Sequence, residues 1–586
     1  MKQNNEQKKI SGIGVAPGVA IGPAYIIEQS GIPVPEYTID EDQTEAEIKR
    51  LQGAIVKVQR HLGQLRKKAE TLPTGSEDMV LLLDAYKGML SGSRLVRGVE
   101  EIITNQHINA EAAIQKQINA LKADFAAMND AYLAARADDV GEVGSRLLRS
   151  LLQQNYNPFA EAPEGCIILA DEITPADAAL LDPGRVVGFA TVLGGAEGHA
   201  AIIARALGLP AISGVGALTH GIHSGDIVII DGRNGELIAR PDVQTLVAYK
   251  RAVARKKQEE KRLRALRDLP AETIDGKPIS LQANMELPRD IDAVDDAGAS
   301  GVGLLRTEFM FMNRSTLPDE EEQYQTLKTI LERLDGKPLT IRTLDVGGEK
   351  IASALGGAVG ESVNPALGLR AIRLGLKRAK LLDTQLAAIL RVSVHGPVRI
   401  LIPMVSSVTQ IKQVRAHLIQ VERRLHRRGI KLRGLPPLGA MIEIPAAALV
   451  ADSLARVCDF FSIGSNDLTQ YTIAIDRGDD SVADLYDPFH PAVLRLIQFT
   501  VAAAWRMNIP VSLCGEMAGD ARATALLLGL GLRELSMSPL RLPAVKNEIM
   551  KISLPDASDF AETILNKTDH DNILAVLQAH FADSRG

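Results

Sequence analysis

The chain has too few cysteines for a disulfide framework or a zinc site, since it contains only Cys166, Cys458 and Cys514, far apart in the sequence. Aromatic residues make up only 4% of it, which disfavours a surface on which the bases of single-stranded nucleic acid stack. It also lacks a G-x-x-x-x-G-K-[ST] segment, so no nucleotide site of the P-loop kind is indicated.

The chain also lacks a large excess of charge of either sign and long apolar runs. The 66 Lys and Arg residues are nearly matched by 72 Asp and Glu residues, and a formal net charge of −6 opposes a general nucleic-acid binder. No apolar run reaches the length of a membrane span, and the N-terminal "MKQNNEQKKISGIG" lacks the apolar core of a signal peptide. We therefore expect a cytoplasmic protein with neither nucleic acid nor a membrane as a partner.

A helical block is present instead near the N-terminus. Between residues 40 and 152 apolar residues recur at three- and four-residue spacing, which predicts a bundle of antiparallel helices. Short strand-like runs flank it, "GVAIGPAYII" before it and "GCIILA", "VVGFA", "AISGVG" and "DIVIIDG" after it. The helices therefore form an insertion in a small α/β domain. Residues 249–269 are charged and free of glycine and proline, and they predict an exposed connecting helix.

Strands and helices alternate regularly beyond Asp275. The candidate strands are "ISLQANM", "GVGLLRTEF", "LTIRTLD", "VRILIPM", "LGAMIEI", "FFSIGSNDL", "PVSLCGEM" and "ELSMSP". Eight strands with helices between them match a (β/α)8 barrel. A doubly wound open sheet is the alternative, and the count of eight favours the barrel.

One histidine stands in an unusual setting within "GGAEGHAAIIARALGL", residues 194–209. His199 lies between a glycine-rich loop and a run of helix-forming residues. The N-terminus of a helix presents free N–H groups and the positive end of the helix dipole, which favour an anion. His199 could therefore hold a phosphoryl group, and a structural histidine at a tight turn is the alternative.

The predicted ends of the barrel strands carry an unusual collection of polar residues, and barrel enzymes react at these C-terminal ends. They are Arg306, Thr307 and Glu308; Arg342 and Asp345; Glu443; Asn466 and Asp467; and Cys514, Gly515 and Glu516, with Arg370 and Arg477 in the segments after strands three and six. Several arginines at one rim suit phosphate or carboxylate, although each could instead pair with a neighbouring acid.

Two of these carboxylates and the cysteine have chemistry of their own. Glu443 and Asp467 are hard oxygen ligands of the kind that Mg²⁺ takes together with a phosphate and water. Cys514 could act as a general acid, or it could be a buried thiol without a role. Together the residues predict a metal-dependent enzyme that acts on a small phosphorylated carboxylate.

Five motifs resemble enzyme I of the bacterial sugar phosphotransferase system, a member of the phosphoenolpyruvate-utilising enzymes. They are "GGAEGHAAIIARALGLPAI", "GVGLLRTEFMFMNR", "NPALGLRAIR", "FFSIGSNDLTQYTIAIDR" and "LCGEMAGD", and the resemblance runs from about Gly12 to about Leu554 in the family's order and spacing. It implies a phosphoenolpyruvate–protein phosphotransferase, which transfers the phosphoryl group of phosphoenolpyruvate to its own histidine, then to a histidine-containing phosphocarrier protein, and releases pyruvate.

The resemblance also implies a role for each residue. His199 would be phosphorylated, Cys514 would protonate enolpyruvate, and Glu443 and Asp467 would hold Mg²⁺. The substrate would be bound by Arg306, Arg342, Arg370, Asn466 and Arg477. The inserted helices would dock the phosphocarrier, and the enzyme would form a homodimer through its barrel.

Four parts follow from this resemblance. They are a phosphohistidine α/β domain of residues 1–37 and 153–240, a helical phosphocarrier-binding domain of residues 38–152, a linker helix of residues 241–270, and a (β/α)8 barrel of residues 271–586 that binds phosphoenolpyruvate.

Pyruvate phosphate dikinase and phosphoenolpyruvate synthase share the histidine domain and the barrel but need a nucleotide-binding domain as well. A regulatory phosphorelay protein that senses phosphoenolpyruvate is the remaining alternative.

The chain departs from the family pattern near the histidine. Glu197 and Gly198 replace the usual Thr-Ser, and Ala178 stands where a hydroxyl group is expected. These departures bear on the orientation of His199 and not on its presence. Because a carboxylate repels a phosphoryl group, we expect Glu197 to face away from the phosphate, towards solvent or Arg205.

Overall fold

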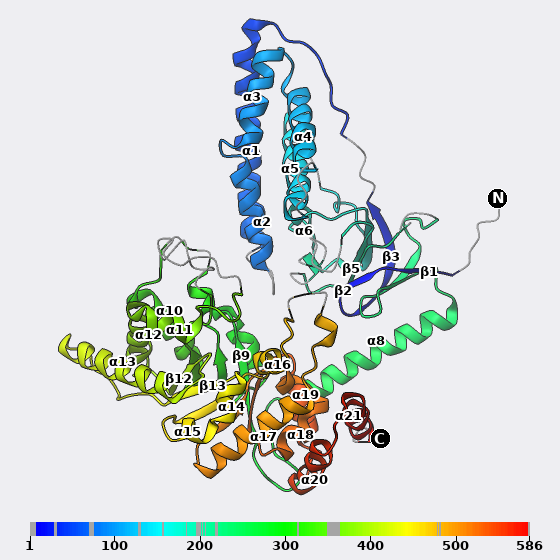
Figure 1. The fold of residues 1–586 in the computed structure, drawn as a ribbon. Helices are drawn as coiled ribbons and strands as arrows, with labels where there is room; N and C mark the ends of the chain where they lie inside the picture. The colour runs from blue at the N-terminus through cyan, green and yellow to red at the C-terminus, as the bar shows by residue number, and fades with distance from the viewer. Residues whose placement is uncertain are drawn as a thin grey trace. The chain divides into compact units, whose positions relative to one another are not determined.

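The computed structural model describes residues 7–27, 32–69, 76–126, 131–154, 157–182, 184–194, 201, 203–204, 207–216, 221–312, 314, 316–347, 364–477, 479 and 482–583. The chain divides into two compact units, Met1–Lys257 and Gln258–Gly586. The first unit contains a mixed sheet and a group of long helices, and the second contains a closed barrel surrounded by helices (Figure 1).

The sheet of the first unit has the strand order β1-β8-β7-β3-β4-β5-β6-β2. Its strands are β1 Lys8–Ser11, β2 Ile13–Ala16, β3 Val19–Ile27, β4 Cys166–Ala170, β5 Val186–Thr191, β6 Ala211–Ser213, β7 Ile227–Asp231 and β8 Glu236–Ala239. The run from β3 to β6 is parallel, and the remaining pairs are antiparallel. The sequence patterns predict β3 to β7 but not β1, β2 and β8, each of which is only four residues long.

Strand β4 explains how the sheet joins two cores. All five of its residues are buried, and alternate side chains of a strand point to opposite faces. Cys166 and Ile168 pack in one cluster with side chains of the long helices, whereas Ile167 and Leu169 pack in a second cluster on the other face. The run "CIILA" is therefore apolar throughout because both faces of the strand are covered.

Long helices fill the chain between β3 and β4, as the sequence predicts (Figure 1). They are α1 Thr44–Ala69, α2 Ser76–Met89, α3 Arg94–Gln106, α4 Ala110–Ala126 and α5 Ala131–Leu151. Helix α1 buries Leu51, Ile55, Val58, Leu62 and Leu65, whose spacing keeps them on one face. The short helix α6, Pro175–Ala178, follows β4, and its Ala176 and Ala178 pack in one cluster with side chains of the long helices.

The connecting helix α8, Val243–Arg264, begins and ends earlier than the sequence pattern suggests. Its start is set by Asp242, whose carboxylate accepts a hydrogen bond from the backbone N–H of Thr245 at 2.7 Å. Residues 265–268 form turns rather than a continuation of the helix. The charged sequence therefore identified the helix but not its bounds.

The second unit is a closed barrel of eight parallel strands, which confirms the predicted (β/α)8 fold and excludes the doubly wound sheet. All eight predicted strands are present. They are β9 Ser280–Met285, β10 Val302–Leu305, β11 Leu339–Arg342, β12 Val398–Ile402, β13 Leu438–Ile442, β14 Phe460–Ile463, β15 Val511–Leu513 and β16 Glu534–Met537.

Helices cover the barrel from outside and share one continuous apolar core with it. They are α9 Ile291–Asp296, α10 Glu320–Arg333, α11 Ala371–Lys377, α12 Ala379–Val392, α13 Val408–Arg427, α14 Pro445–Leu449, α15 Ala451–Ala455, α16 Ser465–Ile473, α17 Pro491–Arg506, α18 Thr524–Gly529, α19 Leu542–Ile549, α20 Leu554–Leu565 and α21 His570–Asp583.

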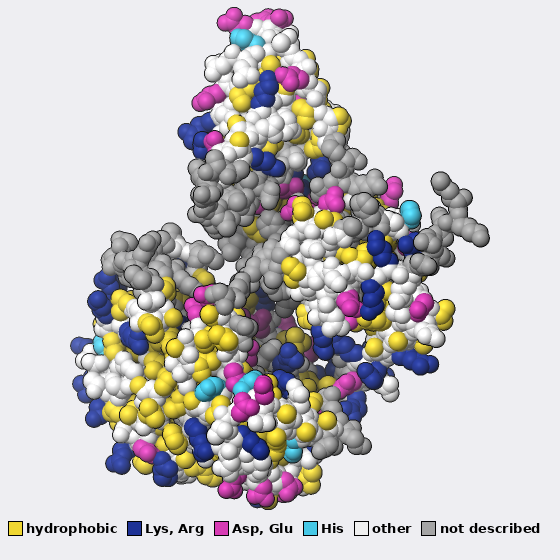
Figure 2. All heavy atoms as spheres, turned by 45° about the vertical axis from the view of Figure 1, so that its right-hand side comes forward, with side chains coloured by type: hydrophobic (Ala, Val, Ile, Leu, Met, Phe, Trp, Pro, Cys, Tyr) yellow, Lys and Arg dark blue, Asp and Glu magenta, His cyan; other side chains and the backbone are white. Residues whose placement is uncertain are grey.

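The surface of the barrel unit shown in Figure 2 carries hydrophobic side chains between charged ones. Leu449, Phe499 and Trp505 are among the large apolar side chains that are exposed. In the part of the chain that the structure describes, no helix combines the length and the apolar character that a bilayer crossing needs.

The contact between α18 and α20 yields a test of the barrel's packing. A Cβ atom on Gly529 would lie 1.9 Å from the carbonyl oxygen of Ala557, a backbone atom that cannot move aside by rotation. We expect Gly529→Ala to lower the free energy of unfolding by roughly 1–3 kcal/mol, measured by urea denaturation. Gly375→Ala is the control, because a Cβ there would make an ordinary 3.5 Å contact with Leu382. Equal stability of the two variants would contradict this account.

Candidate active site at the mouth of the barrel

A cavity of about 830 Å³ opens where the barrel strands end. The predicted site residues of the barrel all line it: Arg306, Arg342, Arg370, Glu443, Asn466, Asp467, Arg477 and Cys514. They lie at the end of different strands or in the segments that follow them, so the closure of the barrel is what brings them together. Asp345 lines the same cavity.

Asp345 joins two of the arginines. Its Oδ1 accepts a hydrogen bond from Arg370 Nη2 at 3.0 Å, and its Oδ2 forms an ion pair with Arg342 Nη1 at 2.9 Å. Burial opposes ionisation of this carboxyl group, but the charges of Arg342 and Arg370 outweigh burial and lower its pKa. Asp345 is therefore an anion that holds both guanidinium groups at the cavity wall.

Glu308 supports the same arrangement from the next strand. Its Oε1 accepts from Arg342 Nη2 at 3.1 Å and from the backbone N–H of Asp345 at 2.9 Å. Glu308 follows β10 in a short 3₁₀ helix, Glu308–Met310, so it clamps the end of β11 to the end of β10. One carboxylate thereby fixes both members of the Arg342–Asp345 pair.

Every arginine of the rim has an acidic partner, as the pairing alternative predicts. Arg306 pairs with Glu286, and Arg477 lies 3.6 Å from an oxygen of Asp467. The pairing does not satisfy all their donors, however. The Nε atoms of Arg306, Arg342 and Arg370 are buried and make no hydrogen bond within the described part of the chain. An anion bound in the cavity is the kind of acceptor to which such N–H groups donate.

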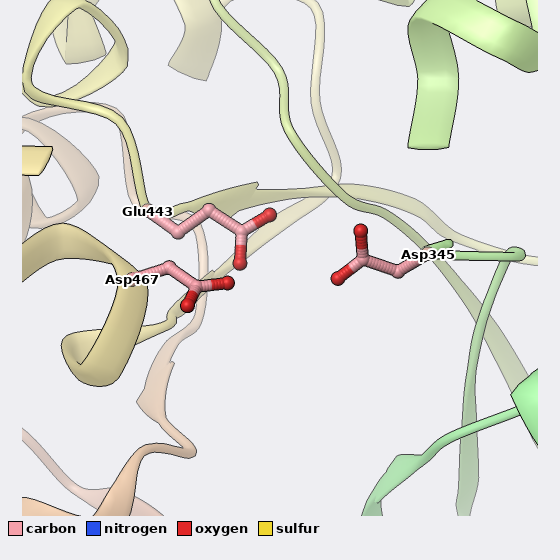
Figure 3. A group of neighbouring side chains, drawn as sticks. All are labelled: Asp345, Glu443 and Asp467. Atoms are coloured by element: carbon pink, nitrogen blue, oxygen red, sulfur yellow. The ribbon is translucent and has the colours of Figure 1, made fainter. Parts of the chain in front are cut away.

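Three carboxylates converge at the centre of the mouth. Asp345, Glu443 and Asp467 each offer an oxygen within 4.8 Å of the others, and Figure 3 shows their carboxylate groups facing one another. Burial, with the charges of Asp345 and Asp467 added to it, raises the pKa of Glu443 to about 8. Three oxygen ligands at this spacing suit a hard divalent cation, which would also relieve the repulsion among them.

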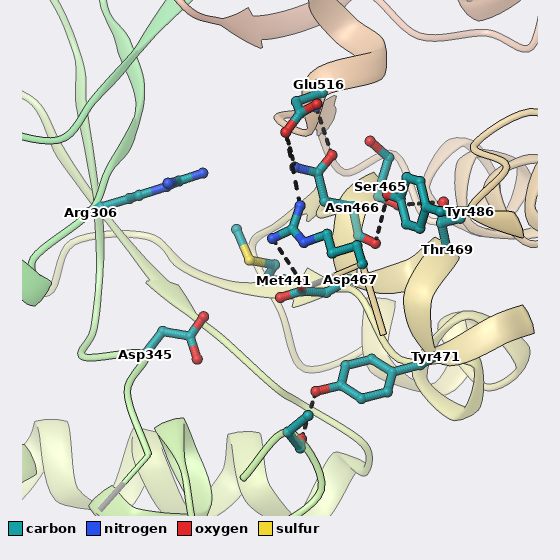
Figure 4. A network of polar contacts seen from close by, with 12 residues as sticks. Arg306, Asp345, Met441, Ser465, Asn466, Asp467, Thr469, Tyr471, Tyr486 and Glu516 are labelled. Atoms are coloured by element: carbon teal, nitrogen blue, oxygen red, sulfur yellow. Dashed lines mark hydrogen bonds and ion pairs between the residues drawn. The ribbon is translucent and has the colours of Figure 1, made fainter. Parts of the chain in front are cut away.

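Helix α16 presents two of the residues at its N-terminal end (Figure 4). The amide of Asn466 pairs reciprocally with Glu516, donating to its Oε1 at 3.2 Å and accepting from its backbone N–H at 2.8 Å. Tyr486 donates to the backbone oxygen of Asn466 at 3.1 Å. The chain after the helix turns at Ala474, which has a φ of 57°, and Arg477 then points back to Asp467.

A second tyrosine ties this helix to the loop that carries Arg370. Tyr471 of α16 donates its hydroxyl hydrogen to the backbone oxygen of Ala366 at 2.6 Å, as Figure 4 shows. The isolated bridge between Gly347 and Arg370 holds the other end of that loop. The position of Arg370 therefore depends on two elements that are distant in sequence.

Cys514 lies at the apolar side of the cavity, directly after β15. It packs with Leu304, Leu401, Met441 and Phe460, and only 3% of its surface is exposed. Burial raises the pKa of the thiol to about 11, so the group is protonated at neutral pH. A protonated thiol beside a charged cavity can give a proton to a substrate carbon.

The histidine segment lies outside the described residues. His199 belongs to it, as do Glu197, Gly198 and Arg205, and the expectations for them stay predictions. Ala178 is described, and it is the buried last residue of α6.

Sequence reasoning missed the residues that hold the site in shape. The sequence places Glu308 and Asp345 at strand ends but gives them no role, because spacing does not show which acid pairs with which arginine. Gln385 was missed altogether: its Nε2 donates to Thr307 Oγ1 at 3.1 Å, and its Oε1 accepts from the N–H of Leu344 at 2.9 Å. A single amide on an otherwise apolar helix face was its only signal. The sequence contains no signal that indicates the roles of Tyr471 and Tyr486.

Three family models match successive parts of the chain. The model of the PEP-utilising enzyme N-terminal region matches residues 11–136, that of the PEP-utilising enzyme mobile domain matches residues 162–235, and that of the PEP-binding domain matches residues 260–554. The last match contains the whole barrel mouth.

Curated relatives match the chain almost from end to end. The phosphoenolpyruvate-protein phosphotransferase of Cupriavidus necator is 41% identical over 580 residues, which cover 97% of this chain and 98% of the relative. The proteins of the same name from Priestia megaterium and Geobacillus stearothermophilus are 37% and 38% identical, and each alignment covers 98% of this chain and 99% of the relative. These matches confirm the predicted resemblance: the chain belongs to the PEP-utilising enzyme family and, within it, to the phosphoenolpyruvate-protein phosphotransferases.

Proposed function

We propose that this chain transfers the phosphoryl group of phosphoenolpyruvate to its own His199 and then to a histidine of a small phosphocarrier protein, releasing pyruvate. This reaction is the first step of a bacterial sugar phosphotransferase system. The observation that carries the proposal is the barrel mouth, where arginines and three carboxylates converge on one cavity. The name and the end-to-end coverage of the relatives support it.

The arginines supply the charge that a phosphoryl transfer needs. Arg306, Arg342 and Arg370 hold the phosphate and the carboxylate of phosphoenolpyruvate, and Asn466 and Arg477 complete the contacts from α16 and the turn after it. Phosphoryl transfer depends on positioning and on neutralising the phosphate oxygens, and fixed guanidinium groups do both. Asp345 and Glu308 keep two of these groups in place before the substrate arrives.

The acidic group would hold Mg²⁺ through Glu443 and Asp467, with Asp345 beside them. Three carboxylates fit this ion, because Mg²⁺ binds through one or two carboxylates together with water and substrate phosphate. When bound, the ion neutralises charge on the phosphate oxygens.

Cys514 completes the reaction by protonating C3 of enolpyruvate. The thiol carries its proton at neutral pH, and Leu304 and Met441, which pack with Cys514 and line the cavity beside it, give the methylene carbon an apolar surface to lie against. The enol is trapped as the ketone, which makes the transfer favourable in the forward direction.

The other parts of the chain serve the partners. The helical domain of residues 38–152 docks the phosphocarrier. The α/β domain of residues 1–37 and 153–240 carries His199 between the phosphocarrier and the barrel. The linker helix of residues 241–270 joins both domains to the barrel of residues 271–586. We further propose a cytoplasmic homodimer that associates through the barrel, where apolar side chains such as Phe499 and Trp505 are exposed.

The first test follows the phosphoryl group. With phosphoenolpyruvate labelled at phosphorus and Mg²⁺ present, we expect one acid-labile label on the intact protein and none on His199→Ala. The label should pass to the phosphocarrier from the intact protein and not from His199→Ala. His223→Ala is the matched control, since that imidazole is exposed and should leave labelling unchanged. Normal labelling of His199→Ala would overturn the assignment.

The second test uses the raised pKa of Glu443. At pH 7, below a pKa of about 8, Glu443 carries a proton in the metal-free protein, and a metal ion requires the carboxylate. Binding of Mg²⁺ should therefore release close to one proton, and the apparent affinity should fall by about tenfold for each pH unit below 8. Calorimetric titration with Mg²⁺ in buffers of different ionisation enthalpy measures the release.

Glu443→Gln and the pH provide the controls for this titration. The glutamine variant should release no proton, and wild-type release should vanish well above pH 8. A metal titration that releases no proton at pH 7 would show that Glu443 is not protonated there.

A further inference from the structure

A buried serine contacts the sulfur of Cys514. Ser462 of β14 is 1% exposed, and its hydroxyl donates to Cys514 Sγ at 3.2 Å. The thiol lies 3.5 Å from the backbone oxygen of Ile463, which accepts its S–H. The sulfur thus accepts one hydrogen bond and donates another, and both partners belong to the strand beside it.

Apolar packing does not explain a serine at position 462. Its neighbours along β14, Phe461 and Ile463, are apolar and fully buried, and a buried hydroxyl group costs free energy unless it is bonded. Ser512, at the paired position of β15, is also buried, but its hydroxyl contacts the backbone oxygen of Phe461 at 3.4 Å. Of these two serines, Ser462 is the one whose hydroxyl bonds the sulfur.

The backbone of Cys514 is fixed as well. Asn284 of β9 donates its amide hydrogen to the carbonyl oxygen of Cys514 at 2.9 Å, and Ser536 of β16 donates to the amide oxygen of Asn284 at 2.6 Å. The main chain of Cys514 is held from one side and its sulfur from the other. The thiol hydrogen can therefore change position only by rotation about the Cβ–Sγ bond. The proton can turn from Ile463 towards the cavity without the sulfur moving.

We propose that Ser462 is a positioning residue that holds the Cys514 sulfur and stabilises the thiolate left after the proton has gone to C3 of enolpyruvate. This inference rests on the proposed function. In the step, the C3–H bond forms from the electron pair of the enolate, the C2–O bond becomes the ketone, and the S–H bond breaks with its electrons kept on sulfur. A proton from water later restores the thiol.

The physical reason is the strength of a hydrogen bond to a charged acceptor. A thiolate in an apolar cluster has lost its water, so the Ser462 hydroxyl stabilises it more than it stabilises the neutral thiol. The contact is worth more after proton transfer than before it, which is the condition for lowering a barrier.

The experiment is a single turnover of phosphoenolpyruvate with excess full-length protein and Mg²⁺, in which pyruvate formation is timed in H₂O and in D₂O. We expect Ser462→Ala to slow pyruvate formation roughly ten- to a hundredfold and to increase the solvent isotope effect, because proton transfer becomes the slow step. The affinity for phosphoenolpyruvate, measured by calorimetry, should change by less than about twofold. Ser462→Thr, which keeps the hydroxyl, should restore most of the rate.

Two further variants separate the possible failures. Ser512→Ala removes a buried serine of the neighbouring strand and should leave the rate and the isotope effect unchanged; an equal loss in that variant would reduce Ser462 to packing and overturn the inference. Cys514→Ala should abolish the fast step. If Cys514→Ala keeps the wild-type rate, the acid of the proposed function is wrong. If Cys514→Ala is slow while Ser462→Ala is normal, only the inference about Ser462 fails.

Discussion

The Asp345 carboxylate, shared between Arg342 and Arg370, is the interaction on which the barrel mouth depends. The guanidinium groups of buried Arg342 and half-buried Arg370 repel each other, and leaving the buried one without an acidic partner would cost several kcal/mol. Burial opposes the charge of Arg342, but Glu308 and Asp345 outweigh burial and keep its pKa above the ordinary value. Asp345 therefore fixes where positive charge is available to a ligand.

The same carboxylate belongs to the acidic group. It lies with Glu443 and Asp467, so the mouth contains interleaved charges of both signs rather than one patch of each. Such a site suits two ligands of opposite charge, an anionic substrate and a cation. The substrate neutralises the arginines, and the cation neutralises the carboxylates. The two ligands should therefore help each other to bind.

The barrel supplies the rigidity that this balance requires. Arg342 ends β11, Glu443 follows β13, and Asp467 lies in the first turn of α16 after β14. Strand ends in a closed barrel cannot shift independently, and Glu308 and Gln385 tie the end of β11 to its neighbours. The charges are consequently placed by backbone geometry before any ligand binds.

Local pattern predicts part of this from sequence alone. The barrel strands are found because each is an apolar run between helical segments, and the site residues because they stand at the ends of those runs. Strand β1 is not predicted, since three of the four residues of "KKIS" are polar and its pairing with β8 spans almost the whole first unit. The roles of Glu308 and Ser462 escape as well, because a role that consists of holding another side chain exists only once the strands are adjacent.

The most direct test of the central claim is the coupling between the two ligands of the barrel mouth, measured by calorimetric titration of the full-length protein. Interleaved charges predict that phosphoenolpyruvate binds about tenfold or more tightly with saturating Mg²⁺ than without it, and that Mg²⁺ gains the same factor from phosphoenolpyruvate. The factor should collapse in Asp345→Asn, which leaves the two arginines without their shared partner. Affinities of the intact protein that are independent of each other would contradict the account.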